Sequence, residues 1–101
     1  MGHTSGMYGV VARWEFEPKD ESKLVSVSKV LMDDLRSWPG VVSGIDIKVA
    51  PNAILSVITY KDEAIYKALI SDPNGPFEKA AKEHDIESIA TWKWSERGEV
   101  I

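Results

Sequence analysis

Cysteine is absent from this sequence of 101 residues, and histidine occurs only twice. Without cysteine the protein has no disulfide, no thiol nucleophile and no cysteine-ligated zinc or iron–sulfur cluster, and we expect a reducing, cytoplasmic compartment. A metal centre usually needs three or more converging ligands, and His84 is the only histidine after the first six residues. We therefore predict neither a bound metal nor a cofactor.

The sequence also lacks long apolar runs and clusters of basic residues. No segment approaches the roughly 20 apolar residues that a membrane-spanning helix needs. The formal net charge is −4, and acidic and basic residues alternate along the chain. No surface is therefore predicted that would neutralise the phosphates of nucleic acid or of an anionic membrane, and neither is expected as a partner.

The first six residues, MGHTSG, lack the apolar stretch of a signal peptide. We interpret them as a flexible tail, or as a remnant that precedes a natural start at Met7. Residues 7–101 are predicted to form one domain, because that length supports one modest core. Apolar residues make up 44% of the chain and charged residues 28%, which is typical of a globular protein and not of a disordered one.

Hydrophobic spacing predicts a strand followed by a long helix. The segment 7–17 is rich in β-branched and aromatic residues and has no helical period. Its alternation places five side chains on one face, namely Tyr8, Val10, Ala12, Trp14 and Phe16. From residue 21 to residue 38, apolar side chains recur at steps of three and four residues, which predicts a helix whose buried face holds Leu24, Val27, Leu31, Leu35 and Trp38.

Two strands are predicted next. The segment 43–52 alternates three apolar residues, Ile45, Ile47 and Val49, with Asp46 and Lys48, which indicates a half-buried strand near a sheet edge. The segment 53–60 follows at hairpin distance and has apolar residues on both faces. That pattern favours a central strand buried on both sides.

The remaining segments predict two short helices and a last strand. Asp62 can cap a helix over 63–71. Pro76 is well placed as a first helical residue, and the segment 77–85 after it is predicted to continue that helix. The segment 86–94 reads as a strand, and the polar residues after it read as a tail.

This order of elements predicts a ferredoxin-like α+β fold, in which two helical regions cover one face of a four-stranded antiparallel sheet. The other face would then be uncovered, although the strand 53–60 is apolar on both sides. Soluble proteins rarely expose such a surface. We therefore expect a homodimer that packs sheet against sheet around a two-fold axis.

Three stretches carry a resemblance to a known family: YGVVARWEFEP, WPGVVSGIDI and LSVITYKDEAIYKALISDPNGPFEKAAKEH. The chain from Met7 onward resembles the dimeric α+β-barrel superfamily, close to the antibiotic-biosynthesis-monooxygenase-like and stress-responsive α/β-barrel proteins. The resemblance implies a dimeric barrel. It also implies an activity drawn from cofactor-independent oxygenation of polycyclic aromatic compounds, isomerisation or haem degradation.

The haem-degrading members use an Asn, a Trp and a His, and none of the three matches here. The corresponding positions hold Ala12, Leu69 and Lys82, and His84 lies two residues beyond the histidine position. Two residues rotate a helix by about 200°, so His84 would face away from the expected direction. The resemblance therefore does not imply haem degradation for this chain.

Four residues are the candidate site. His84 is the candidate general base, although a histidine at a helix end is also stabilised there by the helix dipole. Trp14, Trp38 and Tyr66 are candidate ligand-binding residues. Trp14, Trp92 and Trp94 could instead belong to the sheet core or the dimer interface, and we interpret Trp92 and Trp94 as structural.

Two functions stay open from the sequence. The first is a homodimeric, cofactor-independent monooxygenase-like or isomerase-like protein that binds a small apolar or aromatic molecule between helices and sheet. The second is a non-catalytic, ligand-binding or stress-responsive dimeric scaffold. A cleft in which a few polar groups converge would favour the first.

Overall fold

The computed structural model describes residues 6–84 and 86–101, except for the side chains of Pro76, Ala80, Ala81, His84 and Glu87. Most of the predicted tail therefore lies outside the described residues. The elements in chain order are β1 (Tyr8–Glu15), a 3₁₀ turn (Pro18–Asp20), α1 (Glu21–Ser37), β2 (Val41–Ala50), β3 (Ala53–Tyr60), α2 (Glu63–Ser71), α3 (Pro76–His84), a second 3₁₀ turn (Ile86–Ser88) and β4 (Thr91–Glu99).

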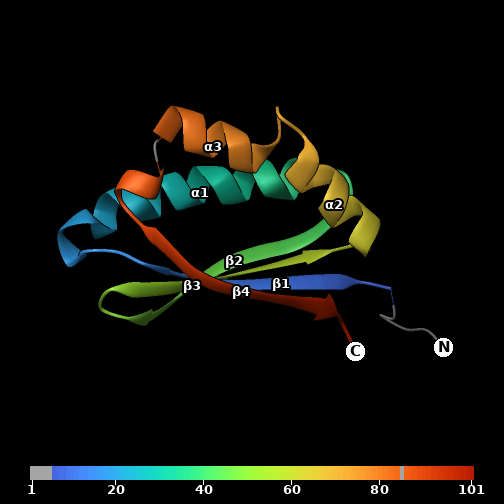
Figure 1. Ribbon diagram of the computed structural model, residues 1–101, viewed down its shortest axis with the longest axis horizontal. Helices are drawn as coiled ribbons and strands as arrows, with labels where there is room; N and C mark the ends of the chain where they lie inside the picture. The colour runs from blue at the N-terminus through green and yellow to red at the C-terminus, as the bar shows by residue number, and fades with distance from the viewer. Residues whose placement is uncertain (1–5, 85) are drawn as a thin grey trace.

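The four strands form one antiparallel sheet in the order β2-β3-β1-β4. Figure 1 shows α1, α2 and α3 on the same side of this sheet. The predicted ferredoxin-like α+β architecture is confirmed, with β2 at an edge and β3 inside the sheet. No helix in the described part of the chain is both long and apolar enough to cross a bilayer.

The predicted helix boundaries are close to the observed ones, except that Asp85, the predicted last residue of the third helix, lies outside the described residues. The Asp62 side chain accepts a hydrogen bond of 2.9 Å from the backbone N–H of Ile65, which confirms it as the N-cap of α2. Pro76 is the first residue of α3, as predicted. The buried residues of α1 are Leu24, Val27, Met32 and Leu35.

β4 begins later and ends later than predicted. Residues 86–88 form a 3₁₀ turn, and the polar segment interpreted as a tail is strand as far as Glu99. Pairing explains the difference, because β1 offers hydrogen-bond partners along its whole length, from Glu15 opposite Thr91 to Tyr8 opposite Glu99. A polar edge strand needs this pairing more than it needs apolar side chains.

A β-bulge separates the two tryptophans of β4. The register between β1 and β4 shifts between Arg13 and Trp14, so Trp14 lies opposite Trp92 while Arg13 lies opposite Trp94. A spacing of two residues predicts one shared face, but the extra residue of a bulge reverses that rule locally. Trp92 therefore lies on the helix side of the sheet and Trp94 on the other side.

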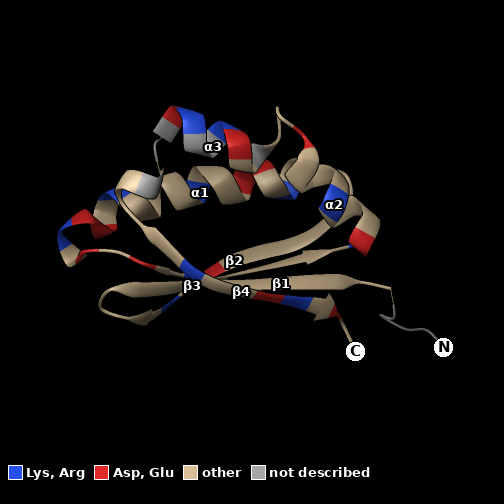
Figure 2. Cartoon of the chain, in the orientation of Figure 1, with Lys and Arg blue, Asp and Glu red and all other residues tan. Residues whose placement is uncertain are grey.

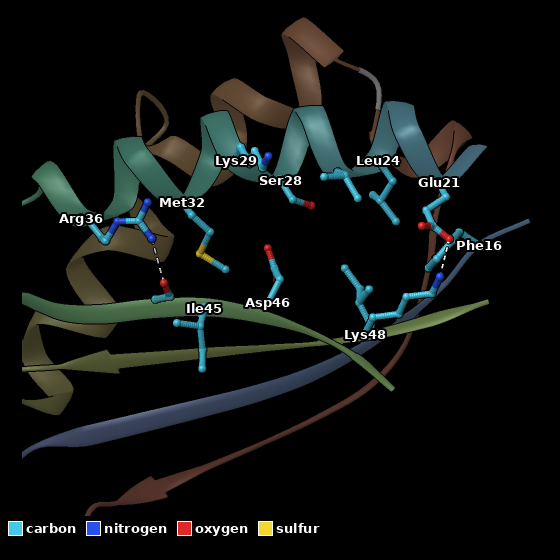
Figure 3. A pocket seen from close by; sticks show the side chains of 13 residues that line it. Phe16, Glu21, Leu24, Ser28, Lys29, Met32, Arg36, Ile45, Asp46 and Lys48 are labelled. Carbon is cyan, nitrogen blue, oxygen red and sulfur yellow. Dashed lines mark hydrogen bonds and ion pairs between the residues drawn. The ribbon is translucent and has the colours of Figure 1, made fainter. Parts of the chain in front are cut away.

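The alternation in β2 is confirmed, but its apolar face is not the buried one. Ile45, Ile47 and Val49 are 53%, 43% and 43% exposed, while Asp46 and Lys48 point toward α1 (Figure 3). The pairing with β3 causes this, because Ile45 lies opposite Val57, on the sheet side away from the helices.

The sheet side away from the helices is called the outer sheet face below. It comprises Val11, Arg13, Ile45, Ile47, Val49, Leu55, Val57 and Trp94. β3, in its middle, carries no charged residue, whereas many charged positions lie on the helices (Figure 2). The single chain thus leaves a largely apolar sheet face uncovered.

The core on the helix side consists of two clusters. One contains the buried residues Phe16, Leu24, Val27, Ile89 and Ala90. The other contains Met32, Leu35, Ile58, Tyr60 and Leu69. Helix α1 contributes to both clusters and joins them across the sheet, so the space between the clusters is bounded by helix above and sheet below.

Gly40, between α1 and β2, has a φ of +92°, which side chains with a Cβ rarely adopt. A Cβ built there would lie 2.7 Å from Cγ2 of Ile65. We expect Gly40→Ala to lower the free energy of unfolding by about 1–3 kcal/mol in urea denaturation. Gly98→Ala is the control, because no atom lies within 4 Å of its added Cβ. Equal losses for both variants would contradict this prediction.

Candidate functional site

A cavity of about 350 Å³ lies between the helices and the sheet, where the two core clusters meet. It is called the aromatic cavity below. Its volume falls at the lower end of the range for small-molecule sites. Its lining includes four aromatic side chains, namely Trp14, Tyr66, Phe77 and Trp92. A fifth, Tyr60, lines it from the sheet.

The two indoles of the aromatic cavity come from neighbouring strands. Trp14 of β1 and Trp92 of β4 are paired across the sheet, and both line the cavity. Trp92 is nevertheless 54% exposed, so it stands at the mouth of the cavity and not in the core. A flat, apolar wall that reaches the surface suits a planar ligand.

Three tyrosines lie together at the side of the second core cluster. The Tyr66 ring centroid is 5.3 Å from those of both Tyr8 and Tyr60, and the Arg97 guanidinium lies 6.0 Å from the Tyr66 ring centre. Burial, and secondarily the neighbouring Tyr66, raise the pKa of Tyr60 well above its ordinary value of 10.0. Tyr60 therefore stays a neutral phenol, which can donate a hydrogen bond to a ligand oxygen.

Among the described residues, two carboxylates line the aromatic cavity: Glu78 on α3 and, on the floor, Asp46. The Ser56 hydroxyl of β3 donates a hydrogen bond of 2.6 Å to its Oδ1. Burial raises the pKa of Asp46 above 3.8, although this hydrogen bond and the nearby Arg36 charge both act to lower it. A partly desolvated carboxylate among apolar side chains is a stronger base than one in water.

Asp46 was not among the predicted site residues, because the alternation in β2 places it on the face opposite three apolar residues, which is the apparent polar face. A usable signal was present in β3. Ser56 is the polar residue between Ile54 and Ile58 on the helix side of β3, and it lies opposite Asp46 in the register. Two short polar side chains opposite each other on neighbouring strands point to a buried hydrogen bond.

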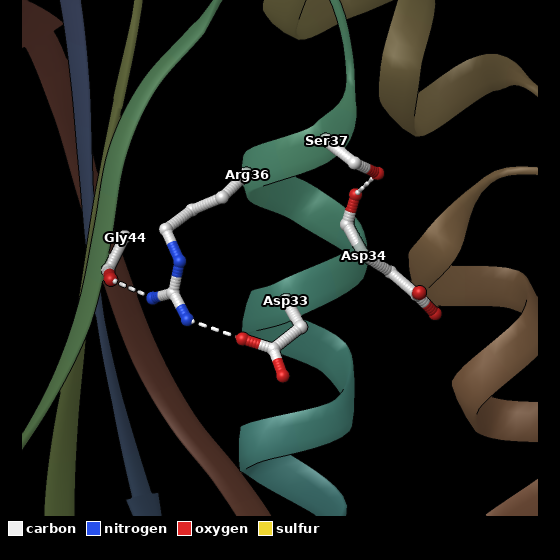
Figure 4. A network of polar contacts seen from close by, with 5 residues as sticks. All are labelled: Asp33, Asp34, Arg36, Ser37 and Gly44. Atoms are coloured by element: carbon white, nitrogen blue, oxygen red, sulfur yellow. Dashed lines mark hydrogen bonds and ion pairs between the residues drawn. The ribbon is translucent and has the colours of Figure 1, made fainter.

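A second cavity of about 360 Å³ lies between α1 and β2, at the edge of the sheet (Figure 3). It is called the α1–β2 cleft below. Lys48 Nζ lies 2.7 Å from Glu21 Oε1 near the start of α1. At the other end, Arg36 donates to the Gly44 carbonyl at 2.9 Å and to Asp33 Oδ1 at 2.6 Å (Figure 4).

The structure brings two of the predicted site residues together and separates a third from them. Trp14 and Tyr66 both line the aromatic cavity, which lies between helices and sheet, where a ligand was predicted. Trp38 instead packs against the second core cluster, away from the wall of the aromatic cavity. The His84 side chain lies outside the described residues, so its proposed role as a base stays a prediction. Trp92 is part of the cavity although it was interpreted as structural.

No protein-family model matches this sequence, and no curated protein matches it significantly. Solved structures do match over nearly their whole length. A conserved protein of unknown function and suggested oxidoreductase from Bacteroides thetaiotaomicron has a TM-score of 0.79 at 13% identity, covering 94% of this chain and 98% of that one.

Two further solved structures bear oxygenase names. SnoaB, a cofactor-independent oxygenase from Streptomyces nogalater, has a TM-score of 0.73 at 17% identity, with 95% of this chain and 92% of that one covered. A proposed antibiotic biosynthesis monooxygenase from Chloroflexus aurantiacus has a TM-score of 0.73 at 16% identity, with 94% and 93% covered. The predicted resemblance to antibiotic-biosynthesis-monooxygenase-like proteins is confirmed at the level of the fold.

Proposed function

We propose that this protein is a homodimeric, cofactor-independent monooxygenase-like enzyme that binds a small planar aromatic molecule in the aromatic cavity. The observation that carries the proposal is Asp46, a partly desolvated carboxylate on the floor of a cavity walled by indole and phenol rings. The structural likeness to SnoaB, a cofactor-independent oxygenase, supports the same class of reaction.

The proposed reaction needs a substrate with an acidic C–H bond that is conjugated with a ketone through an aromatic ring, as in anthrone. Asp46 accepts the proton, and the carbanion reduces dioxygen and forms a carbon–oxygen bond to it. The resulting peroxide takes up the proton and loses water, which converts a CH₂ group into C=O. One oxygen atom enters the product, the other leaves as water, and the substrate supplies all the electrons.

The residues around Asp46 divide the other tasks. Trp14 and Trp92 would hold the ring system flat, so that the reacting carbon lies over the carboxylate. Tyr60 keeps its proton and would donate a hydrogen bond to the oxygen that becomes negative as the C–H proton leaves. Both contributions act through position and charge, and neither requires a cofactor.

The proposed dimer is supported by the outer sheet face. Ile45 is 53% exposed and Trp94 is 43% exposed in the single chain, and Leu55 and Val57 lie between them. A stable interface buries about 800 Å² per partner. A second copy packed on this face would cover the apolar residues and close a barrel from the two sheets.

A tryptophan pair tests the location of the ligand. We expect Trp14→Ala to weaken the binding of anthrone, a planar tricyclic ketone, by about 10-fold to 100-fold, because it removes the cavity wall. Trp94→Ala is the matched control, since the bulge places that indole on the outer sheet face. Isothermal titration calorimetry at concentrations where both variants are dimeric measures the difference. Equal losses in the two variants would refute the placement.

The alternative is a non-catalytic, ligand-binding or stress-responsive scaffold. The Ser56–Asp46 hydrogen bond favours it, because a purely structural pair would link β2 and β3 in the same way. Dioxygen consumption with anthrone separates the two functions. Binding without consumption supports the scaffold, and turnover without consumption would indicate isomerisation through the same proton transfer.

A further inference from the structure

A row of short side chains crosses the floor of the aromatic cavity from one edge of the sheet to the other. The register pairs Asp46 of β2 with Ser56 of β3. Ser56 is paired in turn with Ala12 of β1, and Ala12 with Ser95 of β4. All four residues line the aromatic cavity, and Asp46 also lines the α1–β2 cleft. They are called the short-chain row below.

Larger apolar side chains flank the short-chain row on both sides. Five of them line the aromatic cavity, namely Val10, Trp14, Ile54, Ile58 and Trp92. Ala12 has only a methyl group, so the floor of the cavity is lowest at Ala12, between Ser56 and Ser95. A planar ring can lie in this trough with one serine hydroxyl at each end.

The two serine hydroxyls of the short-chain row differ in what they can offer a ligand. Ser56 donates its hydroxyl proton to Asp46 Oδ1. Ser95 Oγ instead accepts a hydrogen bond from the guanidinium of Arg97. A hydroxyl that accepts from a cation keeps its own proton for another acceptor, and the neighbouring charge makes it a stronger donor. Ser95 can therefore donate into the cavity, whereas the proton of Ser56 is already engaged.

The charges around the aromatic cavity favour a neutral acceptor over an anionic one. Two of the described lining residues, Asp46 and Glu78, carry carboxyl groups that would oppose a negatively charged ligand. The Arg97 guanidinium is engaged with Ser95 and lies 6.0 Å from the Tyr66 ring centre. A ketone or ether oxygen can accept the proton of Ser95 without bringing a further negative charge into the cavity.

We propose that Ser95 is a specificity-determining residue, which donates a hydrogen bond to a neutral acceptor oxygen on the part of the ligand that lies over β4. The inference rests on the proposed function, because the ring system must occupy the aromatic cavity with its reacting carbon at Asp46. Ser56 and Ser95 are two strand spacings apart, or about 10 Å. The acceptor is therefore a substituent on the side of the ring system away from Asp46. The ligand class is a planar aromatic ketone that carries a second ketone or an ether oxygen.

Two probes of matched size test Ser95: 2-acetylanthrone, which carries a second ketone oxygen, and 2-isopropylanthrone, which carries a methyl group in its place. Calorimetry without dioxygen measures their binding in the absence of turnover. We expect the unaltered protein to bind the acetyl compound about threefold to tenfold more tightly, the usual contribution of one neutral hydrogen bond. Ser95→Ala should remove most of this preference and leave the affinity for 2-isopropylanthrone within about twofold, whereas Ser95→Thr should keep the preference. Ser43→Ala is the control, because Ser43 is an exposed serine of β2 outside both cavities.

The outcomes separate the role of Ser95 from the proposed function. Equal affinities of the unaltered protein for the two probes, with both still weakened in Trp14→Ala, would overturn the role of Ser95 alone. Failure of both probes to bind would count against the aromatic cavity as well. The same loss of preference in Ser43→Ala and Ser95→Ala would also overturn the role of Ser95. Ala12→Val, which fills the trough, should weaken both probes alike, and unchanged affinities would show that the ring does not lie on the short-chain row.

Discussion

Asp46→Asn is expected to reduce dioxygen consumption with anthrone at least about 100-fold, because a general base typically contributes that much or more. The amide keeps the size of the side chain and can still accept the hydrogen bond from Ser56, which is 2.6 Å in the unaltered protein. Anthrone affinity should therefore stay within about twofold. Steady-state dioxygen consumption and calorimetric binding measure the two quantities separately.

Asp33→Asn is the control for this loss. It removes an exposed carboxylate from α1 that pairs with Arg36, and it leaves the floor of the aromatic cavity intact. Its turnover should remain near that of the unaltered protein. If Asp46→Asn retained full turnover, Asp46 would not be the base. His84 would then be the next residue to replace.

Asp46→Asn should also stabilise the fold at neutral pH. The native carboxyl has a raised pKa, so the unfolded chain releases its proton near pH 3.8 while the folded chain still holds it. Folding stability consequently falls as the pH rises from 3.8 through the native pKa. Asp46→Asn removes that loss, and its melting temperature should exceed that of the unaltered protein by a few degrees at pH 7. The difference in melting temperature between the two proteins should be smallest below pH 3.8, where Asp46 is neutral in both the folded and the unfolded chain.

Val57→Lys is expected to convert the proposed dimer into a monomer. Val57 lies between Val11 and Ile45 in the middle of the outer sheet face. Two-fold symmetry would bury two such charges in an apolar interface with no partners, which costs several kcal/mol. Sedimentation equilibrium should then show the 11.2 kDa chain instead of twice that mass.

Val30→Lys is the matched control, because Val30 is an exposed valine of α1, on the helix side. It should leave the dimer intact. A monomer for the unaltered protein, or the same dissociation in both variants, would contradict sheet-to-sheet pairing. Circular dichroism of each variant checks that the fold is retained, since a lysine on an exposed sheet face can reach water.

Local patterns along the chain were sufficient to predict the elements and their order. The three- and four-residue spacing of α1 and the cap at Asp62 are short-range features, and both are found in the structure. The alternation of β1 also predicted correctly which side chains, Trp14 among them, point toward the helices. These features depend on neighbours a few residues away, so the sequence alone determined them.

The site depended on contacts between distant segments. Asp46 lines a cavity because the β2–β3 register places it opposite Ser56 and beneath α1, and alternation alone cannot tell which face the helices will cover. Trp92 and Trp94 are separated by a bulge that exists only in the pairing with β1. The sequence thus determined the strands, the helices and their order. The tertiary structure decided which face of each strand became core, cavity or outer surface, because that choice is made by pairing and packing partners far away in the chain.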